Sequence, residues 1–353
     1  MRQQAFLQWL GQLDRLTPRQ RRQVSAKLNT ILPKHAAGSD TATLIPPPDH
    51  CPHCLASALR PWGTSHGLAR YRCKQCGRTC NALSGTALAR LRHKDHWPNY
   101  ATALIQGESV RMAAQRCGVD KNTAFRWRHR FLRDAADHRA EQEAGIVEAD
   151  ETFFLESFKG QRSLPRPARS RGGVAHKRGI NAEQIPVLVV RDRQGRTADF
   201  KLARLDTEHV QAVLAPLVAR DAVLCTDSAG VYAAFARRYG ITHRTINVRH
   251  GRRVVEGAFH IQNVNAYDSR LKEWMRRFHG VATKYLPNYL GWRRMLERYQ
   301  GGLSPLLCLC EAVGHPRPQQ VMQTSPRKTP RSPMPGAFFM RLAQNSKRID
   351  CFR

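Results

Sequence analysis

Four cysteines stand in two pairs near the front of the chain, Cys51 with Cys54 and Cys73 with Cys76. Each pair has two residues between its members, and residues 55–72 separate the pairs. Four thiolates at this spacing can surround one tetrahedral zinc ion, with sulfur about 2.3 Å from the metal. A redox dithiol is the other use of such a pair, but two pairs in this arrangement favour a structural Zn²⁺ site in a zinc ribbon. The nearby side chains that could compete as ligands are Cys80, His53 and His66.

Two aspartates occupy positions where carboxylates meet in α/β sheets. Asp150 lies in the middle of a predicted strand over 146–155, where a carboxylate is disfavoured unless a metal or a substrate compensates for it. Asp227 directly follows the apolar run 223–226, at the predicted carboxyl end of a strand, where α/β sheets place their ligands. Together the two side chains could hold Mg²⁺ or Mn²⁺, ions that stabilise the attacking and leaving oxygens in phosphoryl transfer. Either aspartate alone would more simply be a cap or a turn residue.

The charge of the chain indicates a polyanionic partner. Its 353 residues include 58 Lys and Arg against 27 Asp and Glu, so the formal net charge is +31. Because self-repulsion penalises so basic a compact protein, nucleic acid is the expected partner, and binding should weaken as the salt concentration rises. A ribosome-associated protein, or a basic tail on an unrelated domain, is the alternative.

The sequence favours the cytoplasm over export or a membrane. The start of the chain lacks an apolar run with a cleavage site, and no stretch approaches about 18 apolar residues. The cysteines outside the two pairs are scattered, so we expect free thiols in a reducing compartment.

Composition and hydrophobic periodicity divide the chain into parts. The predicted parts are N-terminal helices and a linker (1–47), the zinc ribbon (48–82), a helix-turn-helix region (96–138), an α/β domain (144–300) and a basic, disordered tail (314–353). The strands expected in the α/β part are 146–155, 185–191, 197–203, 222–226 and 243–248, and its helices are 207–220, 230–239, 260–279 and 288–299. A hairpin meander followed by crossovers predicts a multidomain α+β chain whose large domain is a mixed sheet flanked by helices.

Residues 108–132 predict two helices joined by a tight turn. Gly118 can adopt the positive φ that such a turn requires, and Asp120 can cap the next helix. An ordinary helical hairpin is the alternative, but cationic side chains cluster on the second helix, as they do in helices that enter a major groove. The predicted DNA-contacting residues of this helix are Lys121, Asn122, Thr123, Arg126, Arg128 and Arg130.

A long basic insertion, 156–184, separates the first two strands of the α/β domain. It is too polar to pack, and loops of this length are usually functional or disordered. We expect this insertion to contact DNA, with Lys177 and Arg178 among the contacts. A solvent-exposed loop without a binding role is the alternative.

Three segments resemble motifs of one family. The runs 147–152 (Val-Glu-Ala-Asp-Glu-Thr), 226–232 (Thr-Asp, then Tyr) and 260–272 (His to Leu-Lys) are similar to motifs of the ISXO-type bacterial insertion-sequence transposases. Members of that group combine an N-terminal zinc ribbon, a helix-turn-helix and a ribonuclease H-like DDE catalytic domain. The resemblance covers residues 48–300 and implies the same organisation here.

The resemblance also implies roles for single residues. Asp150 and Asp227 correspond to the first two ligands of catalytic Mg²⁺ or Mn²⁺, and Asn265 corresponds to the third, where many relatives carry Glu and some carry Asn. Lys272 follows Asn265 by seven residues (272 − 265 = 7), two helical turns, and corresponds to a basic residue that holds a DNA phosphate. His260 corresponds to a histidine that contacts the scissile DNA.

The amide at position 265 matters for metal binding, because it brings no negative charge to a metal ion. Glu256 and Asp268 are candidate substitutes for the third acid, but the pattern around Asn265 favours Asn265. The residues that depart from the family's pattern are Gln262, Ala266 and Asp268.

The resemblance implies a DNA transposase that binds the terminal inverted repeats of a mobile element. Divalent ions would support strand cleavage at the element end and transfer of the released 3′-hydroxyl to target DNA. Both ends must meet, so a homodimer or larger assembly on DNA is expected, at the nucleoid of a bacterial cytoplasm. The alternatives are a non-catalytic DNA-binding regulator, a metal-dependent nuclease of the same fold and a degenerate transposase.

Overall fold

The structure is a computed structural model that describes residues 47–169, 173, 175–177, 181–247 and 253–314, together with isolated positions before residue 47. The predicted N-terminal helices, almost all of the predicted tail and Arg178 lie outside the described residues. The residues described from position 47 onward belong to one compact unit, Met1–Arg317. None of the helices described is both long and apolar enough to span a bilayer.

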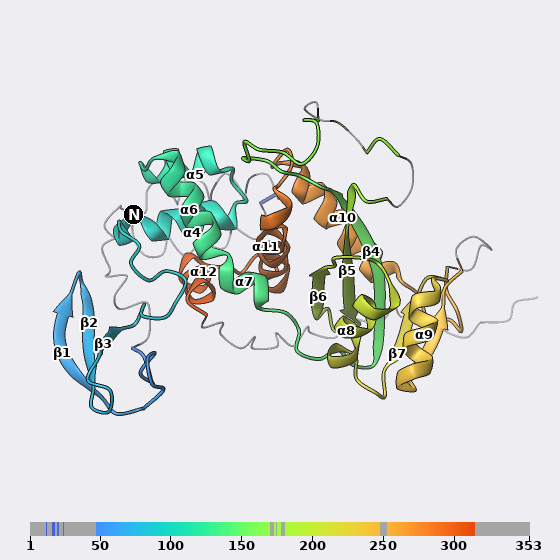
Figure 1. The fold of residues 1–353 in the computed structure, drawn as a ribbon, viewed down its shortest axis with the longest axis horizontal. Helices are drawn as coiled ribbons and strands as arrows, with labels where there is room; N and C mark the ends of the chain where they lie inside the picture. The colour runs from blue at the N-terminus through green and yellow to red at the C-terminus, as the bar shows by residue number, and fades with distance from the viewer. Residues whose placement is uncertain are drawn as a thin grey trace, which may run out of the picture. The chain divides into compact units, whose positions relative to one another are not determined.

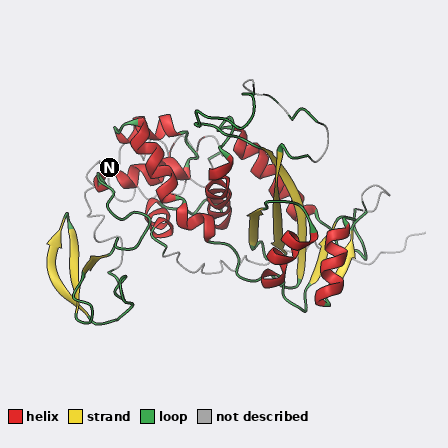
Figure 2. Cartoon of the chain, in the orientation of Figure 1, coloured by secondary structure: helices red, strands yellow, loops and turns green. Residues whose placement is uncertain are grey.

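The paired cysteines lie on and beside a small antiparallel sheet of order β1-β2-β3, drawn in yellow with the larger sheet in Figure 2. Its strands are β1 (Leu59–Ser65), β2 (Leu68–Cys73) and β3 (Thr79–Asn81). The first hairpin turns on His66 and Gly67, whose φ angles of 51° and 74° suit a two-residue turn with positive φ at both positions.

The helices that follow include two that are joined by the predicted tight turn. They are α4 (Trp97–Ile105), α5 (Val110–Cys117), α6 (Lys121–Phe131) and α7 (Arg133–Asp137). Gly118 ends α5 with a φ of 61°, which a residue with a Cβ adopts only at a cost. Asp120 then caps α6, because its carboxylate accepts a hydrogen bond from Asn122 N at 2.7 Å.

The larger sheet has five strands in the order β6-β5-β4-β7-β8 (Figure 1). They are β4 (Ile146–Leu155), β5 (Gln184–Asp192), β6 (Thr197–Lys201), β7 (Val223–Thr226) and β8 (Thr242–Thr245). β4 pairs antiparallel with β5 and parallel with β7, so the sheet is mixed, as predicted. β8 ends earlier than predicted, at the residue that pairs with the last residue of β7.

Alternation along the strands divides their side chains between two helical layers. The flanking helices are α8 (Thr207–Leu217), α9 (Gly230–Tyr239) and α10 (Gln262–Arg276). Val147 and Ala149 pack in the core with α8 and α9. Val187 and Val189 belong to the core on the opposite face, which α10 covers. This helix–sheet–helix arrangement around a mixed sheet fits a ribonuclease H-like domain.

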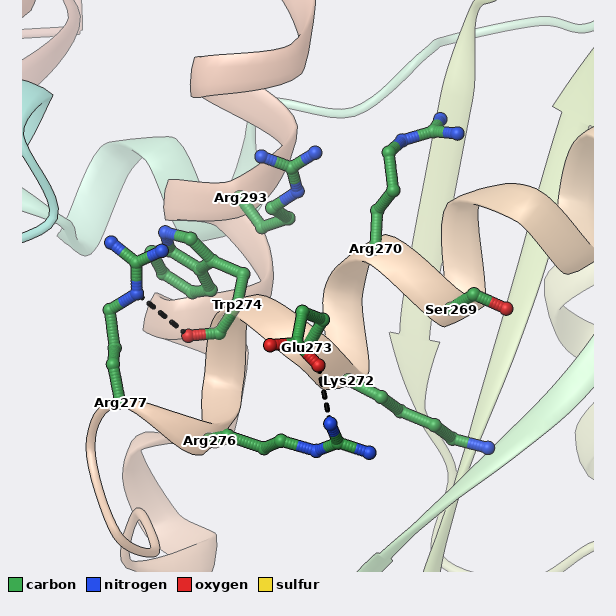
Figure 3. Close-up of a pocket in the computed structure, with 8 residues that line it drawn as sticks. All are labelled: Ser269, Arg270, Lys272, Glu273, Trp274, Arg276, Arg277 and Arg293. Carbon is green, nitrogen blue, oxygen red and sulfur yellow. Dashed lines mark hydrogen bonds and ion pairs between the residues drawn. The ribbon is translucent and has the colours of Figure 1, made fainter.

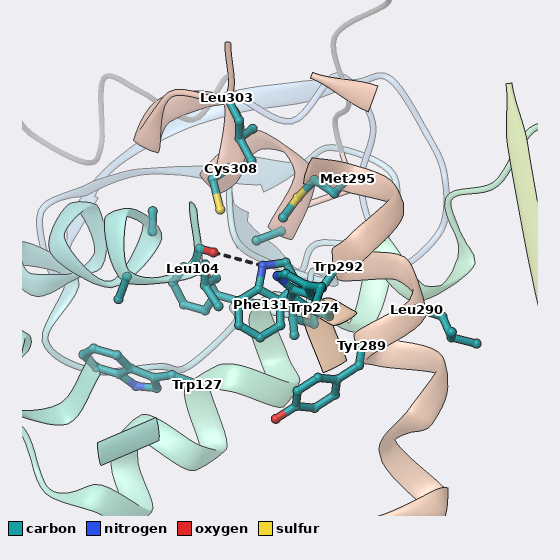
Figure 4. Packing of buried hydrophobic residues seen from close by; sticks show 14 of the residues in the cluster. Leu104, Trp127, Phe131, Trp274, Tyr289, Leu290, Trp292, Met295, Leu303 and Cys308 are labelled. Atoms are coloured by element: carbon teal, nitrogen blue, oxygen red, sulfur yellow. Dashed lines mark hydrogen bonds between the residues drawn. The ribbon is translucent and has the colours of Figure 1, made fainter. Parts of the chain in front are cut away.

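Two C-terminal helices, α11 (Leu286–Arg298) and α12 (Pro305–Ala312), pack against α4 and α7. Trp292 of α11 is fully buried among them, and its Nε1 donates a hydrogen bond to Leu104 O at 3.0 Å (Figure 4). One continuous apolar cluster therefore joins the helix-turn-helix region to the helices that follow the large sheet.

A buried ion pair ties the sheet to α11. Asp199 of β6 accepts a hydrogen bond from the Arg294 guanidinium, and both side chains are almost fully buried. Arg294 also donates to Ala135 O at 3.1 Å and Ala136 O at 2.9 Å, and Tyr267 OH donates to Asp199 at 3.0 Å. Each buried charge is thus hydrogen-bonded, as the low dielectric of the interior requires.

Candidate active site

The candidate active site lies where β4 and β7 run side by side. In this parallel ladder, each residue of β4 pairs with the residue of β7 whose number is 77 higher, as Ile146 does with Val223 (223 − 146 = 77). Asp227 follows Asp150 by the same offset (227 − 150 = 77), two positions beyond the last pair of the ladder. Residues at one level of adjacent parallel strands point to the same face. The register therefore places the two aspartates side by side, on the face that α10 covers.

The electrostatics of the two carboxylates agree with this placement. Burial raises the pKa of Asp150 and the charge of Asp227 raises it further, whereas a hydrogen bond from Glu151 N at 2.9 Å and the charge of Lys272 lower it. Asp227 accepts a hydrogen bond from Ala229 N at 2.9 Å, just before α9 begins. Asp227 therefore serves as a turn residue and also lies beside Asp150.

Glu148, two residues before Asp150 on the same strand face, holds the start of α10. It is fully buried and accepts hydrogen bonds from Asn263 N at 2.8 Å and Val264 N at 3.0 Å. A carboxylate at a helix N-terminus satisfies free N–H groups and is favoured by the helix dipole. The sequence shows Glu148 on the Asp150 face but does not reveal this partner.

His260 lies beside the same carboxylate. Its Nδ1 is 3.4 Å from Glu148 Oε1, and the Arg193 guanidinium lies between 2.7 and 3.1 Å from the ring nitrogens while pairing with Glu148 at 2.7 Å. Burial and the positive charge of Arg193 lower the pKa of His260. These two effects favour the neutral form of the ring, whereas the charge of Glu148 favours the protonated form.

Glu151 points to the other face of β4 and connects it to α9. Its carboxylate accepts a hydrogen bond from Tyr232 OH, and Tyr232 is fully buried. The pKa of Glu151 is raised to about 7, mainly by burial. The hydrogen bond from Tyr232 lowers this pKa, and the charges of Asp150 and Asp227 raise it. Since α9 begins three residues after Asp227, this contact helps to hold both aspartates at one level.

Asn265, Asp268 and Lys272 share one side of α10, because spacings of three, four and seven residues bring side chains to the same helix face. Asn265 and Lys272 are exposed, whereas Asp268 is only 6% exposed. Burial raises the pKa of Asp268 to about 8, with a further contribution from Asp150 and an opposing one from Lys272. The other candidate third acid, Glu256, is exposed and pairs with Arg244 at 3.2 Å.

Comparison with protein families shows what kind of domain surrounds these residues, because residues 142–293 match one family model. That model describes an ISXO2-like transposase domain. The chain is also 29% identical, over 252 residues, to an uncharacterized protein in transposable element ISH50 of Halobacterium salinarum. That match covers 68% of this chain and 82% of the relative. The predicted resemblance to insertion-sequence transposases is confirmed.

Solved structures show a weaker similarity. The crystal structure of the Mos1 mariner paired end complex with Mn is 11% identical, with a TM-score of 0.18, and the match covers 62% of this chain and 79% of that chain. A pre-cleavage Mos1 transpososome is 12% identical, with the same TM-score, and the match covers 60% and 78%. Scores of this size do not support an argument about the fold.

An open depression of about 690 Å³ lies on α10, with Arg293 of α11 at its border (Figure 3). Its lining residues are Ser269, Arg270, Lys272, Glu273, Trp274, Arg276, Arg277 and Arg293. Cations dominate this lining, although Arg276 pairs with Glu273, and both Arg270 and Arg293 pair with Glu297. The charge of Lys272 also lowers the pKa of Asp150, so this basic surface includes a residue that acts on the candidate site.

The predicted DNA-contacting residues of α6 divide into exposed and buried ones. Lys121, Asn122 and Arg126 are exposed, and Thr123 is half-buried. The prediction for Arg128 is wrong, since its side chain is fully buried.

Arg128 is part of the core because a carbonyl and an indole surround it. Its Nη2 donates to Glu108 O at 2.8 Å, and its guanidinium carbon lies 4.6 Å from the centroid of the Trp292 ring. Arg130 is half-buried and donates to the carbonyls of Ala87 and Ala89, the latter at 2.8 Å. These contacts give Arg130 a structural role, and its predicted DNA contact stays a prediction.

The four paired cysteines come together in the structure. Cys51 Sγ and Cys76 Sγ lie 3.6 Å apart, as do Cys54 Sγ and Cys73 Sγ, and all four sulfurs are within 4.8 Å of one another. Sulfurs placed tetrahedrally about 2.3 Å from zinc would be about 3.8 Å apart, so the cluster has the size of a zinc site. Among the described residues, the predicted competitors Cys80, His53 and His66 are not part of the cluster.

The basic insertion between β4 and β5 is anchored at its base. Arg169 Nη1 donates to Glu156 O at 2.6 Å, and Arg169 Nη2 donates to Glu183 at 2.9 Å. Lys177 is exposed, as a DNA contact requires, and Arg178 lies outside the described residues.

Proposed function

We propose that this chain is an enzyme that cleaves and transfers DNA strands, with Asp150 and Asp227 as ligands of catalytic Mg²⁺ or Mn²⁺. The observation that carries the proposal is the offset of 77 positions, which the two aspartates share with the paired residues of β4 and β7. Adjacent carboxylates repel each other, and each raises the cost of ionising its neighbour. A divalent cation with oxygen ligands offsets that repulsion.

The other residues of the site would position the DNA. When bound, the divalent ions would stabilise the charge that develops at the scissile phosphate and activate the attacking oxygen. A third ligand would come from α10, which carries both Asn265, whose amide oxygen is uncharged, and the carboxylate of Asp268 on one side. Lys272 would hold a phosphate oxygen beside the carboxylates by a charge-assisted hydrogen bond. Glu148, by holding the start of α10, would keep Asn265 and Lys272 in place relative to β4.

DNA binding would use surfaces on both sides of this site. The exposed start of α6, with Lys121, Asn122 and Arg126, would enter a major groove of the terminal repeats, with Thr123 beside them. Lys177 and His260 would contact DNA nearer to the cleavage point. Because two element ends must be joined, the active assembly would be a homodimer or a larger oligomer on DNA.

Strand cleavage tests the proposal directly. Purified protein should be incubated with Mg²⁺ or Mn²⁺ and DNA that carries the terminal repeats of the element, and the products resolved on a denaturing gel. We expect 3′-hydroxyl ends at the repeat boundary and, with target DNA added, joined products. Tight repeat binding without cleavage in either metal would indicate a regulator or a degenerate copy, and nicking without joining would indicate a nuclease.

Zinc removal should unfold the ribbon. In small zinc sites the metal supplies most of the folding free energy, so chelation or Cys54→Ser should release the β1–β3 sheet and weaken repeat binding about tenfold or more. The measurement is the titration of reactive thiols, together with repeat affinity by fluorescence anisotropy. The control is Cys117→Ser, a buried thiol of α5 outside the cluster, which should leave zinc content unchanged. Full repeat affinity in a zinc-free chain would contradict the account.

A further inference from the structure

Asp268 is a buried carboxylate without a described partner for one of its oxygens. The side chain is 6% exposed, and its Oδ1 has no hydrogen-bond partner among the described residues. An unpaired buried carboxylate is costly, and it persists where a cation or a proton compensates for it. The charges that act on it most strongly, Asp150 and Lys272, both belong to the proposed active site.

Contacts at both ends of α10 set its position along β4. At the start of the helix, Asn263 N and Val264 N donate to Glu148 at 2.8 and 3.0 Å. Just beyond its end, Phe278 O accepts a hydrogen bond at 3.2 Å from Lys159, which follows the end of β4. The helix therefore runs parallel to the strand, with residue numbers rising in the same direction.

This alignment puts Asp268 level with Asp150. Asp150 lies two strand residues beyond Glu148, a rise of about 6.6 Å. The same distance along a helix is about four residues, which leads from Asn263 and Val264 to Asp268. Asn265 stands three residues, or about 4.5 Å, short of that level, and its side chain is exposed.

We propose that Asp268, rather than Asn265, supplies the third ligand of the divalent ion that Asp150 and Asp227 hold. The inference rests on the proposed function, because it concerns the same metal site. A third carboxylate brings the negative charge that the amide of Asn265 lacks, and the ion gives Oδ1 the partner that it lacks among the described residues. Asn265 then remains free to contact the DNA backbone.

Mn²⁺ binding separates the two candidates without a need for cleavage. The full-length, zinc-loaded chain should be titrated with Mn²⁺, and free Mn²⁺ followed by electron paramagnetic resonance. Asp268→Asn keeps the shape of the side chain and removes its charge, so we expect Mn²⁺ affinity to fall about tenfold or more. Asn265→Ala should leave the affinity close to that of the parent chain.

Two controls make either outcome decisive. Asp268→Asn should melt no lower than the parent without added Mn²⁺, because burial favours the neutral form of Asp268 and asparagine resembles that form. Asp150→Asn should abolish the binding, which tests the proposed function itself. Unchanged affinity in Asp268→Asn, or a larger loss in Asn265→Ala, overturns the inference while the proposed function stands. If Asp150→Asn binds Mn²⁺ as the parent does, both fail.

Discussion

Asp150→Asn and Asp227→Asn should each slow DNA strand cleavage by about 10³-fold or more, a barrier increase of about 4 kcal/mol. The register of β4 and β7, extended by two residues, puts the two carboxylates at one level, so the loss of either charge would weaken the hold on the same ion. The measurement is a single-turnover cleavage rate in Mg²⁺ on repeat DNA. Repeat affinity should change little, because α6 and the ribbon remain intact.

The fold should tolerate both substitutions. Burial and Asp227 raise the pKa of Asp150, so the folded state favours its neutral form and the ionised form lowers stability at neutral pH. Asparagine resembles the neutral form, so Asp150→Asn should melt at or above the parent temperature at pH 7. Asp206→Asn is the matched control, since Asp206 is a half-buried cap of α8 outside the candidate site, and it should cut DNA at the parent rate. Cleavage within threefold of the parent in either active-site variant would contradict the assignment.

Gly291→Ala should lower the free energy of unfolding by at least about 2 kcal/mol. Alanine favours a helix over glycine by about 1 kcal/mol, so propensity alone predicts the opposite sign. At this position, however, an added Cβ would lie 2.2 Å from Ala135 O and 2.6 Å from Ala136 Cα, where α11 crosses α7. Backbone atoms cannot swing aside as a flexible side chain would. Urea unfolding followed by circular dichroism measures the change.

Gly230→Ala is the matched control for that prediction. Gly230 begins α9, has an ordinary φ, and would bring an added Cβ no closer than 4 Å to other atoms. Its substitution should leave stability unchanged or raise it by up to about 1 kcal/mol. If both glycine variants behaved alike, the close crossing of α7 and α11 would be wrong.

Local sequence signals predicted much of the secondary structure. The bounds of β4 and α9 agree with the predicted 146–155 and 230–239, because apolar alternation and a flanking turn mark them. Gly118 and Asp120 predicted the turn between α5 and α6, because glycine suits a positive φ and aspartate caps the helix that follows. α12 was not predicted, since Pro305–Ala312 is short and almost uniformly apolar, without a helical period.

The features that the sequence could not reveal depend on partners distant in the chain. Arg128 has the charge of a DNA contact, but the indole of Trp292, far along the chain, holds it in the core. Glu148 acts on the start of α10, more than a hundred residues later. The burial of Asp268 likewise depends on how α10 packs on the sheet. Residue type and spacing report local geometry, whereas these roles come from tertiary packing.

Iron-directed cleavage of the polypeptide tests most directly whether Asp150 and Asp227 share a divalent ion. Fe²⁺ in place of Mg²⁺, with ascorbate and peroxide, produces hydroxyl radicals that cut the backbone next to the ion. The account predicts fragments that end near both 150 and 227, suppressed together by excess Mg²⁺ and lost together in Asp150→Asn. Fragments at one aspartate alone, or at neither, would contradict a shared ion.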